Sequence, residues 1–141
     1  MKKTNTTAWC LILLFVLIAG CASSGSSNLN AMGPNNPDAV KLMVLYPQPT
    51  DVEKFERDYK EHLVLLHEKA NISADDPLPY TVTKFLPGPD GPATYYQLFT
   101  MYYPSAAALQ EARSSLGEVA ADAVRISSGG PPVVMVGSES L

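Results

Sequence analysis

Residues 40–69 read VKLMVLYPQPTDVEKFERDYKEHLVLLHEK, and this stretch contains the first two elements of the fold. Val40–Tyr46 is aliphatic, β-branched and aromatic and stops at a proline, which predicts a strand. Thr50 and Glu53 form a capping-box pattern that predicts a helix from about Asp51 to Lys69. Apolar residues recur every three or four positions along this helix and therefore share one face: Val52, Phe55, Tyr59, Leu63 and Leu66.

The rest of the domain continues the order of strands and helices. A helical region begins at Pro104-Ser105, is interrupted near Ser114-Ser115, and restarts at a second capping box formed by Ser115 and Glu118. Three more strands are expected, at Tyr80–Leu86, Thr94–Tyr103 and Val133–Gly137. This order predicts an α+β, ferredoxin-like βαββαβ domain over residues 39–139, with both helices on one face of an antiparallel sheet.

Apolar residues on both faces of the expected sheet predict an interface. Strict alternation in the third strand gives two largely apolar faces: Tyr95, Gln97, Phe99, Met101 and Tyr103 on one, and Tyr96, Leu98, Thr100 and Tyr102 on the other. Two helices cover only one face of such a sheet. We therefore expect a homodimer packed sheet to sheet, and the alternative is a monomer whose open face is covered by solvated tyrosines.

The N-terminus has the order of features found in a bacterial lipoprotein signal. Lys2 and Lys3 form a basic head, and Ala8 to Ala19 is an apolar run too short to span a membrane. The run ends in LIAGC at Cys21, which resembles a lipobox. Residues 1–20 are therefore predicted to be a signal peptide, and the alternative is an uncleaved anchor. Cleavage would leave Cys21 as a lipidated N-terminus that anchors the protein to a membrane.

Residues 21–38 are predicted to be the lipidated cysteine and a flexible linker, because Ser, Gly, Asn and Pro dominate them. Ala22 and Ser23 follow Cys21, so in a Gram-negative cell we expect sorting to the outer membrane, facing the periplasm. Two of the ten basic residues precede Cys21 and all fourteen acidic residues follow it, so the mature chain carries a net charge of −6. Nucleic acid is therefore not an expected partner. With Cys10 removed and Cys21 lipidated, the folded part has no free thiol.

Several short motifs, taken in chain order, carry a family resemblance. They are KLMVLYPQPTD at Lys41–Asp51, then Phe55, Tyr59 and His62-Leu63, then Gly91-Pro92 with Tyr95-Tyr96, and finally Gly129-Gly130. This chain resembles the EthD family of dimeric α+β barrel proteins, named for a component of ethyl tert-butyl ether degradation. The family usually has Leu-Pro-Leu after its helix histidine, whereas this chain has Leu63-Val64-Leu65.

The resemblance implies a barrel-forming homodimer with a pocket between sheet and helices. It also implies an oxidoreductase, or a protein associated with one, that binds a small apolar molecule. Two other functions stay open: a non-catalytic ligand-binding or assembly module of the cell envelope, and a cofactor-free isomerase or monooxygenase, because fold alone does not choose a reaction. No cofactor is expected.

His62 is the candidate catalytic residue. On a regular helix it projects about 20° from Phe55 and about 40° from Leu66, so it points between helix and sheet, where it can transfer protons near neutral pH. The alternative is a structural core histidine that hydrogen-bonds a backbone carbonyl or a tyrosine and takes no part in a reaction. Tyr59, one turn earlier, is its candidate partner. His67 is about 140° away, so the pair cannot chelate a metal; His67 is expected to be solvated and no metal site is predicted. Four aromatic residues are candidates for lining the pocket: Tyr46, Tyr80, Tyr96 and Phe99.

Overall fold

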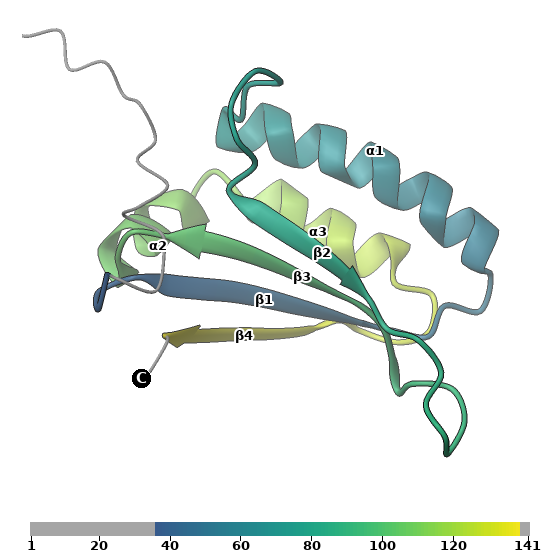
Figure 1. Cartoon of the computed structure of the whole chain (residues 1–141). Helices are drawn as coiled ribbons and strands as arrows, with labels where there is room; N and C mark the ends of the chain where they lie inside the picture. The colour runs from purple at the N-terminus through teal and green to yellow at the C-terminus, as the bar shows by residue number, and fades with distance from the viewer. Residues whose placement is uncertain (1–35, 139–141) are drawn as a thin grey trace, which may run out of the picture.

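The computed structural model describes residues 36–138 and shows one sheet with its helices on one face (Figure 1). The elements follow the order β1 (Val40–Pro47), α1 (Val52–Ala70), β2 (Tyr80–Lys84), β3 (Tyr95–Tyr103), α2 (Ala106–Arg113), α3 (Gly117–Ile126) and β4 (Val133–Ser138). The strands form one antiparallel sheet in the order β2-β3-β1-β4. The predicted α+β, ferredoxin-like class is confirmed. β2 ends earlier than expected, at Lys84 instead of Leu86.

The predicted signal peptide, the lipidated Cys21 and most of the linker lie outside the described residues. Within residues 36–138, no helix combines the length and the apolar character that crossing a membrane requires.

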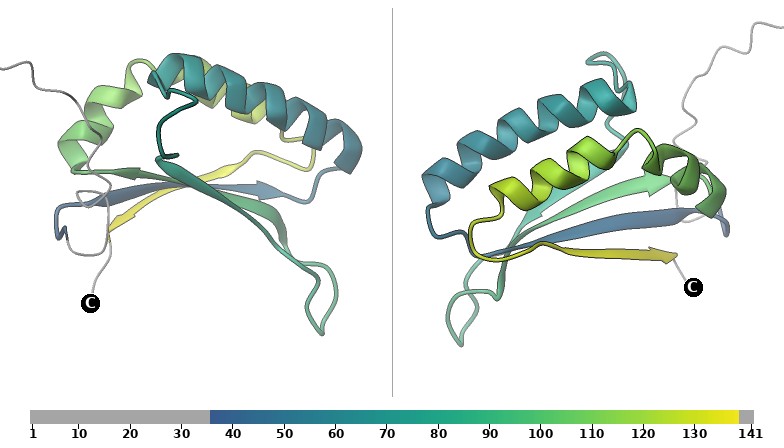
Figure 2. Two further views of the ribbon diagram at one scale, coloured as in Figure 1. Left: turned by 45° about the horizontal axis from the view of Figure 1, so that its top comes forward. Right: turned by 180° about the vertical axis from the view of Figure 1, so that it is seen from behind.

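Helices α1 and α3 lie side by side over one face of the sheet, and α2 lies at one end of it (Figure 2). No helix of residues 36–138 covers the other face. Its strands present Met43 and Leu45 on β1 and, in register with them, Met135 and Val133 on β4. Leu98 and Tyr102 on β3 belong to the same face, because Leu45 and Lys41 are their partners. The prediction that both faces are largely apolar is confirmed for these residues, and the homodimer inferred from it stays a prediction.

One irregularity changes the expected alternation in β3. Tyr46 pairs with Gln97, but the next residue of β1, Pro47, pairs with Tyr95, so Tyr96 is the extra residue of a β-bulge. Tyr96 therefore turns toward α1, where its ring packs edge-on against Phe55 at 5.5 Å between ring centroids. The expectation that strict alternation places Tyr96 on the face away from the helix was wrong, because a bulge shifts the two-residue period by one.

The helix caps also differ from the predicted capping boxes. Asp51 caps α1 by accepting a hydrogen bond from the backbone N–H of Lys54, so the cap lies one residue later than Thr50. The backbone N–H of Thr50 instead donates to the Ser128 hydroxyl. The predicted Ser115–Glu118 box was wrong too: α3 starts after Leu116 with no side-chain cap, and the Ser115 hydroxyl donates to the carbonyl of Ala112. At Ser115 a local side-chain hydrogen bond competes with capping, whereas at Thr50 the competing bond comes from a distant loop.

The core of the described residues lies between α1, α3 and the covered face. Tyr46, Phe55 and Tyr59 pack ring against ring, with centroids 5.5–5.6 Å apart. The loop before β4 lies close to the end of β1. At this point only a glycine fits, since a Cβ on Gly129 would lie 1.9 Å from the carbonyl oxygen of Gln48. This core draws on β1, β2, β3 and all three helices of residues 36–138, so we expect a chain of residues 36–141 to fold as one domain.

Candidate functional site

A cavity of about 220 Å³ lies between α1, α3 and the helix-covered face of the sheet. Almost all of its wall is aliphatic or aromatic, and His62 is the one ionisable imidazole, amine or carboxyl side chain among its described lining residues. The walls come from every layer of the domain: Leu42, Val44, Tyr46, His62, Leu66, Phe99, Met101, Leu116, Val119, Ala120, Ala123, Val124, Pro132 and Val134. The cavity thus offers an apolar ligand a wall with very few polar side chains.

His62 is 5% exposed and is held by a carboxylate from the other helix. Its Nδ1 lies 2.9 Å from Oδ2 of Asp122 on α3. A carboxylate only accepts, so in the neutral imidazole the proton sits on Nδ1 and Nε2 keeps its lone pair. Burial lowers the pKa of His62 below its usual value, although the hydrogen bond to Asp122 acts in the opposite direction. His62 is therefore neutral near pH 7, with a proton-accepting nitrogen.

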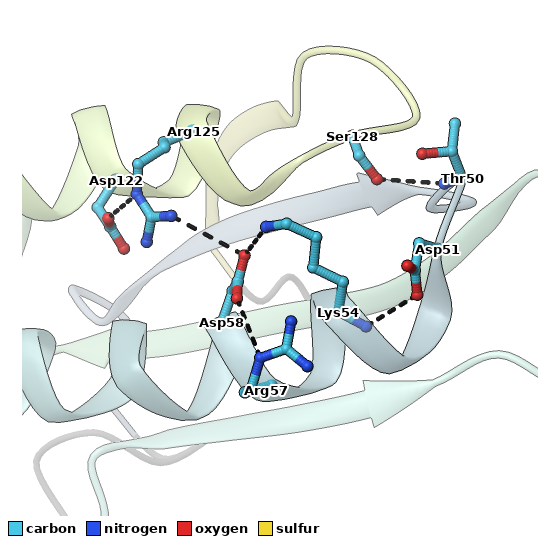
Figure 3. A network of polar contacts seen from close by, with 8 residues as sticks. All are labelled: Thr50, Asp51, Lys54, Arg57, Asp58, Asp122, Arg125 and Ser128. Atoms are coloured by element: carbon cyan, nitrogen blue, oxygen red, sulfur yellow. Dashed lines mark hydrogen bonds and ion pairs between the residues drawn. The ribbon is translucent and has the colours of Figure 1, made fainter.

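Asp122 is in turn part of a chain of charges between the two helices (Figure 3). Nε of Arg125 donates to Oδ1 of Asp122 at 2.7 Å, and Nη1 of Arg125 lies 3.9 Å from the buried carboxylate of Asp58 on α1. Lys54 pairs with Asp58 one turn along the same helix. Burial alone would raise the pKa of Asp122, but the hydrogen bonds from Arg125 and His62 hold it below its usual value. Asp122 therefore stays ionised and fixes the orientation of the His62 ring.

Tyr46 and Phe99 line the cavity, and their contact with a ligand stays a prediction. Burial, together with the charge of Asp122, raises the pKa of the Tyr46 phenol, so the group keeps its proton and acts as a donor. Tyr46 and His62 are thus the two polar side chains among the described residues of the wall.

Tyr59 packs beside His62, with 5.7 Å between the ring centroids, but it is not among the cavity-lining residues. Its hydroxyl is buried and makes no hydrogen bond within the described part of the chain. Burial raises the pKa of this phenol as well. Both polar ends of the fully buried Gln97 side chain also lack a partner among these residues.

Tyr80 and Tyr96 lie away from the cavity wall. The Tyr80 hydroxyl is 2.9 Å from Nε2 of His67, so the expectation of a merely solvated His67 was wrong: the end of α1 packs closely enough on β2 for the two side chains to meet. The Tyr96 hydroxyl donates to Glu56 at 2.5 Å, which raises the pKa of Tyr96 to about 12. Each tyrosine thus ties α1 to the sheet.

Sequence reasoning missed Asp122 and Arg125. A local signal for Asp122 was present, because it lies about 40° from Ile126 on an α3 face that also buries Val119 and Ala123. An acid at the edge of an apolar helix face needs a buried partner, and His62 is the matching residue on α1. In residues 36–138, no group of three or more His, Cys, Asp or Glu residues is placed to hold a metal ion.

Comparisons with known proteins agree with the motifs. No family model and no curated protein matches the chain. A crystal structure of an EthD family protein from Bacillus halodurans C-125 is 28% identical and has a TM-score of 0.60, covering 72% of this chain and 99% of that one. An EthD-like protein from Ralstonia eutropha JMP134 is 20% identical with a TM-score of 0.53, covering 72% of this chain and 91% of that one. The hydroxynitrile lyase of Passiflora edulis is 14% identical with a TM-score of 0.54, covering 74% of this chain and 95% of that one.

These structures define the class of protein. The chain has an EthD-like α+β fold, and the resemblance predicted from its motifs is confirmed. The hydroxynitrile lyase shares the fold alone, at an identity too low to carry its chemistry over. Together, the fold and the cavity indicate a domain that binds or transforms a small molecule.

Proposed function

We propose that this domain binds a small apolar molecule in the cavity and moves a proton to or from it through His62. The observation that carries the proposal is the His62–Asp122 pair, which places a neutral imidazole in an apolar wall. A base in such a place has the right protonation state near neutral pH and is shielded from bulk water.

The direction of proton transfer follows from the hydrogen bonds. Because Asp122 accepts from Nδ1–H, Nε2 is the nitrogen that takes a proton from the ligand. The imidazolium formed would then be stabilised by the ionised Asp122. The Tyr46 phenol, which also lines the wall, is suited to donate a hydrogen bond to a ligand oxygen on which negative charge develops. Tyr59 supports both rings by packing against them.

The setting of the domain is part of the proposal. A lipid on Cys21 would hold the protein on the cell envelope, and in a Gram-negative cell on the periplasmic side of the outer membrane. Two copies would pack through the open sheet face, where Met43, Leu45 and Met135 present apolar surface. The link to an oxidoreductase follows from the family resemblance alone, and the His62 site would serve such a system by proton transfer.

A non-catalytic binding module is the second candidate, and one observation favours it. Asp122 also joins the helices through Arg125 and Asp58, so its bond to His62 has a structural use even without a reaction. In that case the cavity would bind its ligand and His62 would only complete the wall.

The two candidates differ in a solvent-exchange experiment. Residues 36–141 are incubated with cyclohexanone in deuterated buffer, and exchange of the hydrogens next to the carbonyl is followed by NMR. Proton transfer by His62 predicts exchange above the buffer rate that His62→Gln abolishes. The matched control is His67→Gln, which removes the other histidine of α1 and should keep the exchange. Binding of cyclohexanone with no exchange, or equal exchange in both variants, would rule out catalysis by His62.

A further inference from the structure

The cavity has a buried interior and an exposed mouth on one side. Among its lining residues, Tyr46, His62 and Leu66 are almost fully buried. Val124 on α3 and Val134 on β4 line the same cavity and are 57% and 60% exposed. The cavity therefore opens between α3 and the edge strand β4, while its two polar groups lie inside.

The apolar surface continues outward from this mouth. Val136 follows Val134 on the same face of β4 and is 46% exposed. Val136 is in register with Leu42, which lines the cavity. Apolar surface therefore continues from the cavity to the exposed edge of the sheet at β4. Val133 and Met135 point to the opposite face of β4. Val133 and Met135 thus belong to the open face of the sheet, whereas Val134 and Val136 lie at the mouth of the cavity.

The charges around the interior select against an anion. Asp122 is ionised and bonded to His62, and burial keeps His62 neutral. No lysine or arginine is among the described residues that line the cavity. A carboxylate or phosphate at His62 would lose its hydration without gaining a cation, because Arg125 is already paired with Asp122 and does not line the cavity. The ligand group that reaches His62 is therefore uncharged.

The volume limits how much of a ligand the interior holds. The cavity of about 220 Å³ exceeds the roughly 150 Å³ apolar cavity known to accept benzene, and it has room for about seven water-sized groups. A ligand of seven heavy atoms fills it, and anything longer must leave through the mouth onto Val124, Val134 and Val136.

We infer that the ligand is a neutral amphipathic molecule with an aliphatic chain. Its hydroxyl or carbonyl group lies between His62 and Tyr46, and its chain passes through the mouth and covers the valines of α3 and β4. This assignment rests on the proposed function, since it uses the same cavity, and it adds the chemical class and the direction in which the ligand lies.

A series of 1-alkanols from butanol to decanol tests the assignment by calorimetric titration of residues 36–141. Each added methylene buried on apolar surface tightens binding about fourfold. We expect the affinity to keep rising beyond hexanol, which has seven heavy atoms, because the longer chains contact the rim. Decanoate, which has the same chain and a charged head, should bind at least tenfold more weakly than decanol.

Two valine variants locate the chain. Val136→Ser should weaken decanol binding about fivefold and leave butanol binding unchanged, because Val136 lies outside the cavity. Val64→Ser is the control, since Val64 is an exposed valine on the outer side of α1 and should leave both affinities unchanged.

The outcomes separate this inference from the function on which it rests. If no alkanol binds, the cavity is not a ligand site and both fall. If butanol and hexanol bind and His62→Gln weakens them, but affinity stops rising at hexanol, only the chain assignment is overturned. Decanoate binding as tightly as decanol overturns the neutral head group. If Val136→Ser changes the oligomeric state and not the affinity for decanol, the mouth is covered by a second copy, and the chain assignment is again overturned.

Discussion

His62 and Asp122 are sixty positions apart in the sequence, yet Nδ1 of one lies 2.9 Å from Oδ2 of the other. The pair joins α1 to α3 at the wall of the cavity. The hydrogen bond fixes the tautomer of the imidazole. It also places an ionised carboxylate beside the ring, where the carboxylate would stabilise the imidazolium after proton uptake. Stability and the proposed chemistry therefore depend on the same contact.

The first prediction concerns acid stability. Since burial lowers the pKa of His62 in the folded state, the unfolded chain binds the proton more tightly. The stabilisation from the neutral ring is complete above the ordinary histidine pKa of about 6.5 and is lost as the pH falls below it toward the folded-state value. Denaturant unfolding at a series of pH values should show this loss in the native protein and a smaller one in His62→Gln. A His62→Gln profile parallel to the native one in that window would contradict the assignment.

The second prediction compares two acids that link the same helices. Asp122→Asn should lower the free energy of unfolding by about 1–3 kcal/mol, because it removes the ionised acceptor of the buried His62. Glu118→Gln breaks the Lys69–Glu118 pair, whose glutamate side chain is 71% exposed, and should leave the free energy of unfolding nearly unchanged. Urea titration of both variants measures the difference. Equal losses would show that the His62–Asp122 bond has no special weight.

The third prediction uses the buried phenols. Tyr59→Phe removes a buried hydroxyl that has no hydrogen-bond partner among residues 36–138, and it should leave stability unchanged or raise it by up to about 1 kcal/mol. Tyr80→Phe removes the hydrogen bond to His67 and should lower stability by about 1 kcal/mol. Thermal and urea unfolding distinguish the two. A marked loss of stability in Tyr59→Phe would mean that its hydroxyl has a bonding partner in the folded protein.

The fourth prediction concerns the loop before β4. Gly129→Ala would place a methyl group against the Gln48 carbonyl, so the loop must move away from β1, at a cost of about 1–3 kcal/mol. Gly88→Ala is the control, because a Cβ at Gly88 meets nothing within 4 Å, and it should have little effect. Unfolding experiments that find Gly129→Ala as stable as Gly88→Ala would contradict the close approach.

The fifth prediction tests the homodimer. Residues 36–141 should sediment as a dimer at micromolar concentration, and Met135→Lys on the open sheet face should dissociate it by burying a charge in the interface. Val64→Lys, on the outer side of α1, should leave the dimer intact. A native protein that sediments as a monomer would overturn the sheet-to-sheet proposal.

Much of the fold could be predicted because it depends on local patterns. Runs of β-branched and aromatic residues place all four strands, and the spacing of apolar residues gives α1 and the face on which His62 lies. The capping residues were predicted less well. Thr50 and Asp51 are neighbours with the same capping chemistry, and the approach of Ser128 to Thr50 depends on a loop almost eighty residues later.

By itself, the sequence determined the order of the elements, the EthD-like resemblance and the inward direction of His62, because helix and strand periods act over a few residues. The tertiary structure alone decided which groups meet. It brought Asp122 to His62, His67 to Tyr80, and, through the bulge opposite Pro47, Tyr96 to Phe55. These contacts depend on how two helices and a sheet pack in space. The residue pattern within one element does not predict which residues of another element it will meet. The cavity and its mouth between α3 and β4 arise from the same packing.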